Sequence, residues 1–286
     1  VHRDKAIQKL LPRGNLSLQC LVNPATDEII TLPKDIASKL IEHWKVVFSK
    51  RDITTLHTTS DVKAHLAHVR DKWWNEDGFK LPTDTNWQFD ISHVEQAIKF
   101  ATHSAPGPDG IPYNAFQGYE GSAEILFHVC EYLLAGHDPP KDFNQAYLAL
   151  LPKKPLRHDP VHGDVCGPEQ TRPLSLVNTF NRLIASAFRI FLEPIIGAEV
   201  SQEQQGFIFG RSMLKNILDV DTAAHEFFQS DHGHAAIVLF DFKAAFPSLD
   251  HDFLFDTLAR VGMPESWIGA IKSLYKDNSH ILRLDG

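Results

Sequence analysis

Apolar residues recur every three or four positions in several stretches of the chain, which predicts a helix-rich protein. Between residues 32 and 48 this spacing predicts an amphipathic helix, and Pro33 suits its first turn. Ser92 and Glu95 have the spacing of a capping box, which predicts a short helix from Ser92 to about residue 101. The same apolar spacing predicts further helices over residues 122–135, 180–195, 212–229, 250–261 and 264–276.

Fewer segments have the pattern of strands. Residues 146–151 and 235–240 are apolar runs of strand length, and the second run suits a strand buried on both faces. Residues 279–284 have the pattern of one strand of a hairpin. Residues 104–112, with three prolines and two glycines, and residues 152–171 are predicted loops. The expected fold class is therefore α+β and helix-rich.

The composition indicates a packed globular chain with an excess of acidic residues. Its 286 residues are 43% hydrophobic, which is enough for a sizeable core, and the formal net charge is −8. Residues 141–215 hold nine Lys or Arg and seven Asp or Glu, so this segment carries +2 and the rest carries −10. A face that touches a polyanion would explain this distribution, and so would ordinary charge fluctuation.

The sequence predicts neither disulfides nor a membrane span. Its cysteines are Cys20, Cys130 and Cys166, which are odd in number and far apart, so a reducing compartment is expected. No stretch reaches the roughly 18 apolar residues that a spanning helix needs. The loop at residues 152–171 gathers several potential metal ligands, namely His158, Asp159, His162, Asp164 and Cys166. Their spacing fits no tetrahedral site well, so we predict a polar loop there.

The clearest chemical signal is Asp241, which directly follows the apolar run at residues 235–240. A carboxylate at the end of a buried strand can be held rigidly while its oxygens face a cleft. Polymerases need that arrangement, because Mg²⁺ ions must bridge protein carboxylates and nucleotide phosphates. The alternative is that Asp241 merely caps the turn after the strand.

Five motifs follow one another along the chain: Ala105–Ile111 (APGPDGI), Leu150–Lys154 (LLPKK), Arg172–Asn178 (RPLSLVN), Gln205–Arg211 (QGFIFGR) and Asp241–Pro247 (DFKAAFP). In this order they resemble the fingers and early palm of reverse transcriptases from non-LTR (LINE-like) retrotransposons. Each motif alone is weak, but five in the right order are specific. Residues 26–48 also resemble, less distinctively, the linker that joins endonuclease and polymerase in such elements.

The resemblance assigns the reaction centre to the last of these motifs. It implies that Asp241 is the first metal-binding aspartate and that the Phe242 carbonyl adds a ligand. It also implies that Phe246 is the steric gate that excludes a ribose 2′-OH. Pro247 and Ala244 depart from the family pattern, since many relatives carry Asp and a basic residue there. Neither position is the metal ligand, so the departures weaken the match without removing the chemistry.

The resemblance also implies contacts to the nucleotide and the nucleic acid. Arg172, with Lys153 or Lys154, would reach the triphosphate, where guanidinium and ammonium groups stabilise phosphate charge. The alternatives are an ion pair between Arg172 and a helix carboxylate, and a solvated pair of loop lysines. Gly206 and Arg211 would lie near the template or primer backbone, or else form a structural turn and a surface charge. The Pro–Gly loop would shape the fingers and contact the template, or serve structure alone.

The family implied is an RNA-directed DNA polymerase of the right-hand type, with an RNA template, a DNA primer, dNTPs and Mg²⁺. Residues 1–90 are expected to be a linker or N-terminal extension, and residues 91–286 the fingers and an incomplete palm with a truncated sheet. The second metal-binding strand, an aromatic-Ala-Asp-Asp turn, is not present before Gly286. The chain is therefore expected to be a fragment, inactive alone and poorly soluble, and intracellular, in the nucleus or cytoplasm.

There are two alternatives to a clipped or decayed retrotransposon enzyme, and the second comes from another class of protein. One is a group II intron-like or domesticated reverse transcriptase, although the motifs fit LINE-type elements better. The other is a non-catalytic RNA-binding relic that retains the fingers for contacts to the nucleic-acid backbone. RNA binding that depends on salt but not on Mg²⁺ would favour the relic.

Overall fold

The chain divides into two units, each formed from segments that are far apart in the sequence. The first unit comprises residues 1–53, 89–188 and 264–286, and the second comprises residues 54–88 and 189–263. The computed structural model describes residues 18–49, 80–229, 236–242 and 245–284. Much of the predicted N-terminal extension, residues 1–17 and 50–79, lies outside the described residues, as do Lys243 and Ala244 of the Asp241 motif.

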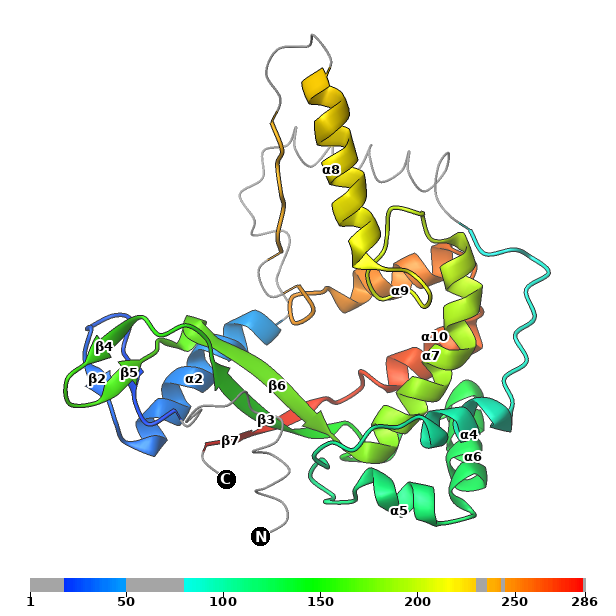
Figure 1. The fold of residues 1–286 in the computed structure, drawn as a ribbon. Coiled ribbons are helices and arrows are strands. Elements are labelled where there is room, and N and C mark those ends of the chain that lie inside the picture. The colour runs from blue at the N-terminus through cyan, green and yellow to red at the C-terminus, as the bar shows by residue number, and fades with distance from the viewer. Residues whose placement is uncertain (1–17, 50–79, 230–235, 243–244, 285–286) are drawn as a thin grey trace, which may run out of the picture. The chain divides into compact units, whose positions relative to one another are not determined.

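A three-stranded sheet forms the centre of the first unit (Figure 1). In chain order, the strands of this unit are β1 (Leu21–Val22), β2 (Ile29–Ile30), β3 (Gln145–Pro152), β4 (Arg157–Asp159), β5 (Gly163–Val165), β6 (Thr171–Val177) and β7 (Ser279–Arg283). Strand β3 is central and pairs antiparallel with β6 and parallel with β7. The predicted strand at residues 146–151 is thus confirmed. Residues 279–283 are extended as predicted, and β7 pairs in parallel with a strand far away in sequence. The expected hairpin stays a prediction.

Most helices of the first unit follow the predicted apolar spacing, but α5 (Tyr113–Gly118) and the 3-10 helix η3 (Pro168–Gln170) were not predicted. The others are α2 (Pro33–Phe48), α4 (Ile91–Lys99), α6 (Ser122–Leu134), the start of α7 (Thr179–Glu199) and α10 (Glu265–Ser273). Helix α2 lies along one side of the sheet (Figure 1). There Leu40 and Trp44 of α2 form a core with Leu148 and Leu150 of β3. The Trp44 indole donates a buried hydrogen bond of 2.9 Å to the Thr171 hydroxyl, which ties α2 to the start of β6.

The predicted loop at residues 152–171 is wrong in part, because it contains the hairpin β4–β5 and the helix η3. Leu21 of β1 forms an isolated bridge with Cys166, just beyond β5. Arg157 of β4 forms an ion pair of 2.7 Å with Asp27 in the β1–β2 turn. A hairpin this short is marginal by itself. The contacts of this hairpin with β1 and the β1–β2 turn, over a hundred residues earlier, stabilise it, and no local sequence pattern shows such contacts.

Helix α4 begins one residue earlier than predicted, and its cap is a different residue. The Asp90 carboxylate accepts a hydrogen bond of 2.9 Å from the Ser92 backbone N–H, while the His93 ring accepts one of 3.3 Å from the Asp90 N–H. The reciprocal pattern of a capping box is therefore present, but it uses Asp90 and His93 rather than Ser92 and Glu95. Asp is as good an N-cap as Ser, so the sequence offered two acceptable starts.

The second unit contains the end of α7 together with α8 (Met213–Gln229) and α9 (His251–Arg260). Helix α9 ends at Arg260, and Gly262, two residues later, has a φ of +92°, the left-handed conformation that glycine adopts without strain. Helix α8 is amphipathic as predicted, yet none of its residues is buried, and Leu214 and Ile217 are 59% and 63% exposed. No helix in the described part of the chain is long and apolar enough to cross a membrane.

Candidate functional site

Asp241 does not lie at the end of a buried strand, and that prediction is wrong. Residues 236–242 form no strand, and Phe240 and Phe242 are 88% and 81% exposed. A strand needs partners for its backbone N–H and C=O groups, and no strand in the described residues pairs with this segment. High apolar content alone was not enough to form a strand here. The sheet therefore does not hold the Asp241 carboxylate in this structure.

The residues around Asp241 do not by themselves fit a pair of Mg²⁺ ions. Within the described ranges, no three His, Cys, Asp or Glu side chains lie close enough together to hold a metal. Mg²⁺ in phosphoryl-transfer sites is held by carboxylates together with substrate phosphates. Asp241 and the Phe242 carbonyl supply too few oxygen ligands for two ions. No catalytic step through a metal follows from this arrangement.

Phe246, the predicted steric gate, lies beside the Gln–Gly–Phe motif. Its ring is 6.0 Å from that of Phe207, centroid to centroid, in an edge-to-face arrangement of 88°. Both side chains are highly exposed, at 80% and 89%. Aromatic pairs of this geometry attract one another. The structure thus brings together two motifs that are separated by more than thirty residues in sequence, both in the second unit.

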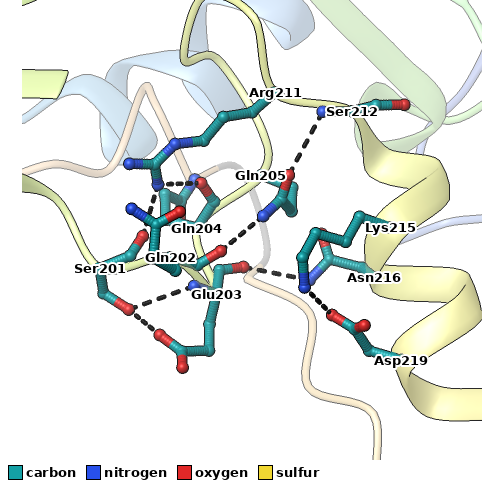
Figure 2. Close-up of polar contacts among 10 residues, drawn as sticks. All are labelled: Ser201, Gln202, Glu203, Gln204, Gln205, Arg211, Ser212, Lys215, Asn216 and Asp219. Atoms are coloured by element: carbon teal, nitrogen blue, oxygen red, sulfur yellow. Dashed lines mark hydrogen bonds and ion pairs between the residues drawn. The ribbon is translucent and has the colours of Figure 1, made fainter. Parts of the chain in front are cut away.

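Arg211, predicted to contact nucleic acid, instead binds backbone carbonyls after the end of α7 (Figure 2). Its Nη1 donates to the carbonyl oxygens of Ser201 and Gln204 at 2.5 and 2.8 Å. Its Nη2 donates to those of Gly197 and Val200 at 3.0 and 2.8 Å. Carbonyls at a helix C-terminus lack intrahelical donors, and an arginine side chain can satisfy them. In this structure, the guanidinium stabilises the end of α7, while a contact of Arg211 with the template or primer backbone stays a prediction.

The loop between α7 and α8 is held by further polar contacts (Figure 2). Gln205 is buried; its amide donates to the Gln202 carbonyl at 2.5 Å and accepts from the Ser212 N–H at 3.3 Å. The Gly206 carbonyl accepts from the Gln204 side chain at 2.9 Å. Gly206 thus lies in a structural turn, the second of its two predicted roles, and a contact to template or primer stays a prediction.

The same loop exposes two aromatic side chains that the sequence analysis did not single out. Phe207 and Phe209 are 89% and 88% exposed, although phenylalanine is usually buried. Phe207 also has a φ of +64°, a conformation that is uncommon outside glycine. Glycines on both sides, Gly206 and Gly210, were the signal in the sequence for a tight turn that projects its side chains.

Arg172, Lys153 and Lys154 lie on the first unit, at one end of the β3–β6 ladder. Arg172 is exposed on β6, with Leu151 as its partner on β3. Lys153 and Lys154 are also exposed, and the Lys153 N–H continues the ladder with a 2.7 Å bond to the Gln170 carbonyl. None of the three has a carboxylate within 4 Å among the described residues. Of the alternatives, the ion pair of Arg172 with a helix carboxylate is therefore not formed there.

The Pro–Gly loop is bound to the junction of β6 and α7. A Cβ atom added to Gly107 would lie 2.4 Å from the Asn178 backbone nitrogen. The Asn178 side chain accepts a 3.1 Å hydrogen bond from the Asp109 N–H. Arg182 of α7 donates to the Ala105 carbonyl at 2.7 Å. These contacts give the loop the structural role predicted for it and place it beside the strand that carries Arg172.

The polar residues of the β4–β5 hairpin pair with one another instead of forming a metal cluster. His158 lies 2.9 Å from Asp164, and His162 lies 2.9 Å from Asp159. Backbone N–H groups of His162 and Val161 donate to Asp159 and lower the pKa of its carboxyl group. The contacts are those of a hairpin turn.

Residues 151–285 match the family described as reverse transcriptase (RNA-dependent DNA polymerase). This match lies in the second half of the chain, and the curated relatives of the chain are proteins of non-LTR retrotransposons. The Xenopus laevis protein "Transposon TX1 uncharacterized 149 kDa protein" is 24% identical over 197 residues, 68% of this chain. The Pol polyprotein of the type-2 retrotransposable element R2DM of Drosophila melanogaster is 25% identical over 195 residues, 67% of this chain.

A third relative, the Pol polyprotein of the type-1 retrotransposable element R2 of Popillia japonica, is 25% identical over 191 residues, 67% of this chain. The chain spans only 14%, 17% and 25% of the lengths of these three relatives. Reverse transcriptases as a family use a divalent metal, a nucleic-acid template and deoxynucleoside triphosphates. The predicted family is confirmed, and the mixed helix-and-sheet fold agrees with it.

Proposed function

We propose that this chain is the fingers and early palm of an RNA-directed DNA polymerase encoded by a non-LTR retrotransposon. The observation that carries the proposal is the exposed cationic end of the β3–β6 ladder. Arg172, Lys153 and Lys154 lie there without acidic partners among the described residues, inside the segment that matches the family. Exposed cations without acidic partners on a rigid strand pair suit a polyphosphate ligand.

In the proposed reaction, each group has a role set by its chemistry. Arg172 would offer a planar fork of donors to the triphosphate of the incoming nucleotide, and Lys153 or Lys154 a point charge. Phe246 would press against the sugar and exclude a ribose 2′-OH. Asp241 and the Phe242 carbonyl would ligate Mg²⁺ together with carboxylates from the rest of the full-length protein. The metal would supply charge stabilisation at the reacting phosphate.

The domain boundary stays part of the proposal. We propose that residues 91–286 are polymerase and that residues 1–90 precede it as an extension. The part of the extension that the structure describes is not a free tether, because residues 18–48 pack into the core beneath β3. The extension would therefore hold the fingers sheet in place, and the protein would act inside the cell, in the nucleus or the cytoplasm.

The exposed apolar segments support the proposal that the palm is incomplete in this chain. The side chains from Ile237 to Phe240 are between 65% and 88% exposed, and α8 has no buried residue. Monomeric proteins rarely expose contiguous apolar surfaces of this kind. In the full-length protein, the rest of the palm sheet would pair with residues 236–240 and rebuild the strand that the sequence predicts.

Primer extension tests the proposal. The 286-residue chain and the full-length protein that contains it would be compared on an RNA template with a DNA primer, dNTPs and Mg²⁺. We expect extension by the full-length protein and none by the chain alone, because one carboxylate does not hold two ions. Extension by the isolated chain, or none by a folded full-length protein that binds the primed template, would contradict the proposal.

A non-catalytic RNA-binding relic is the second candidate. The cationic end of the β3–β6 ladder supports it, because exposed arginine and lysine side chains bind backbone phosphates without a metal. A relic would bind RNA with strong salt dependence and without dependence on Mg²⁺, and its full-length form would not extend a primer.

A further inference from the structure

Strand β7 places another arginine on the same face of the sheet as Arg172. The Cα partner of Arg283 on β3 is Ala149, and the partner of Arg172 is Leu151. Ala149 and Leu151 are two residues apart, so their side chains point to the same side of the sheet. Arg172 and Arg283 therefore flank β3 on one face, which we call the arginine face.

The arginine face is the less buried side of the sheet. Burial alternates along β3, with Ala146, Leu148 and Leu150 buried, and Tyr147 and Ala149 only partly so. The buried side packs against α2, which runs along that side of the strands (Figure 1). On the arginine face Ile281, which is the partner of Tyr147, is 43% exposed. This face can thus be reached by a ligand, whereas α2 covers the buried β3 residues of the other face.

The ring of Tyr147 holds the Arg283 side chain on this face. The guanidinium carbon lies 4.0 Å from the centre of the ring, within the range of a cation–π contact. Such a contact uses the flat face of the guanidinium and leaves the N–H donors at its edge for other partners. Neither Arg283 nor Arg172 has a carboxylate within 4 Å among the residues that the structure describes.

The separation of the two arginines suits a chain of phosphates. Strands β6 and β7 lie on either side of β3, so their backbones are about 10 Å apart. A stacked nucleic-acid strand advances about 3.4 Å per nucleotide, so roughly three nucleotides cover that distance. On the same face as the two arginines lie Tyr147, Leu151 and the partly buried Leu174. Ring and apolar surfaces of this kind suit unpaired bases, which a duplex would not present.

We propose that Arg283 binds a backbone phosphate of the single-stranded RNA template, which lies across the arginine face. This inference rests on the proposed function, in which RNA is the template and Arg172 faces phosphate. It adds a contact from β7, outside the five motifs through which the sequence resembles the family. It also gives the sheet a second purpose, since β6 would present Arg172 to the triphosphate while β7 binds the template.

The test is the binding of a short fluorescein-labelled single-stranded RNA to the 286-residue chain, measured by fluorescence anisotropy at several salt concentrations. We expect Arg283→Gln to weaken binding about tenfold at low salt. We also expect it to lower the slope of log K against log salt by about 0.7, which corresponds to one lost phosphate contact on a single strand. Arg283→Lys retains the charge and should restore most of the affinity and the slope.

Lys39→Gln is the matched control, because it removes one positive charge from α2, on the other side of the sheet. It should leave both affinity and slope near those of the unchanged chain. Equal effects of Arg283→Gln and Lys39→Gln would overturn the proposal, since only net charge would then matter. Equal affinity for an RNA–DNA duplex would also overturn it. If the full-length protein extends the primer while Arg283→Gln leaves RNA affinity and slope unchanged, the proposed function stands and this inference fails.

Discussion

Substitution of Gly107 by alanine tests how tightly the Pro–Gly loop is bound to the rest of the first unit. The added Cβ would lie 2.4 Å from the Asn178 nitrogen, 2.5 Å from its side-chain oxygen and 2.6 Å from the Val177 carbonyl carbon. Real Cβ atoms essentially never approach so closely, and two of these atoms are backbone, which does not move aside easily. The loop must therefore shift away from the β6–α7 junction.

Two costs add up in this variant. Overpacking of a well-packed site costs about 1–3 kcal/mol. The shift also breaks the hydrogen bond of 3.1 Å between the Asp109 N–H and Asn178, which contributes about 1 kcal/mol. We expect Gly107→Ala to lower the free energy of unfolding by about 2–4 kcal/mol in total, measured by urea denaturation with circular dichroism.

Gly269→Ala is the matched control for Gly107→Ala. Gly269 lies inside helix α10, and no atom lies within 4 Å of its added Cβ. Alanine is the better helix former there, so the control should gain about 0.5–1 kcal/mol. If Gly107→Ala is as stable as the unchanged chain, the loop is not bound as the structure shows, and the reasoning is refuted.

Three further results are expected from the same chain. Arg211→Ala should lower the free energy of unfolding by about 2–3 kcal/mol, because it leaves carbonyls after α7 without a donor. Arg189→Ala, which breaks only an ion pair on the surface, should lower it by under about 1 kcal/mol in the same denaturation assay. Burial raises the pKa of the Cys130 thiol to about 12, so iodoacetamide followed by mass spectrometry should find it unlabelled at pH 8 until the chain is unfolded. The Ser92 hydroxyl and N–H lower the pKa of the Asp90 carboxyl group. The ionised cap should therefore stabilise α4 fully at pH values above the ordinary carboxyl pKa. This stabilisation should be lost as the pH falls through the lowered pKa of Asp90. An NMR titration in which Asp90 has an ordinary pKa would contradict the last of these.

Local patterns in the sequence predicted most elements of this fold but not their partners. Apolar spacing gave α2, α6 and α8 within a residue or two, because one side of a helix is visible in any short window. The same window shows that residues 279–283 are extended, yet it carries no information about the strand beside them. The parallel pairing of β7 with β3 depends on contacts over more than a hundred residues of sequence, which no local pattern records.

The candidate site was harder to predict, because the same residue type suits two partners. An arginine has the same donors whether it faces a phosphate or a backbone carbonyl, and Arg211 binds carbonyls in this structure. Residues 235–240 have the composition of a buried strand, but a strand also needs a neighbour with free backbone groups. The roles of Asp241 and Phe246 stay predictions, while the contact between the exposed rings of Phe207 and Phe246 was visible only in the structure.

The most direct test of the central claim is primer extension by the full-length protein with Asp241 replaced. Asp241→Asn keeps the shape of the side chain and removes the charge that would bind a metal. Asp256→Asn is the control, because Asp256 is an exposed residue of α9 in the same unit, paired with Arg260 at 2.8 Å. We predict that Asp241→Asn lowers the Mg²⁺-dependent rate on an RNA template at least about a thousandfold, while the control stays within about twofold of the unchanged protein. Equal rates for Asp241→Asn and the unchanged protein would contradict the account.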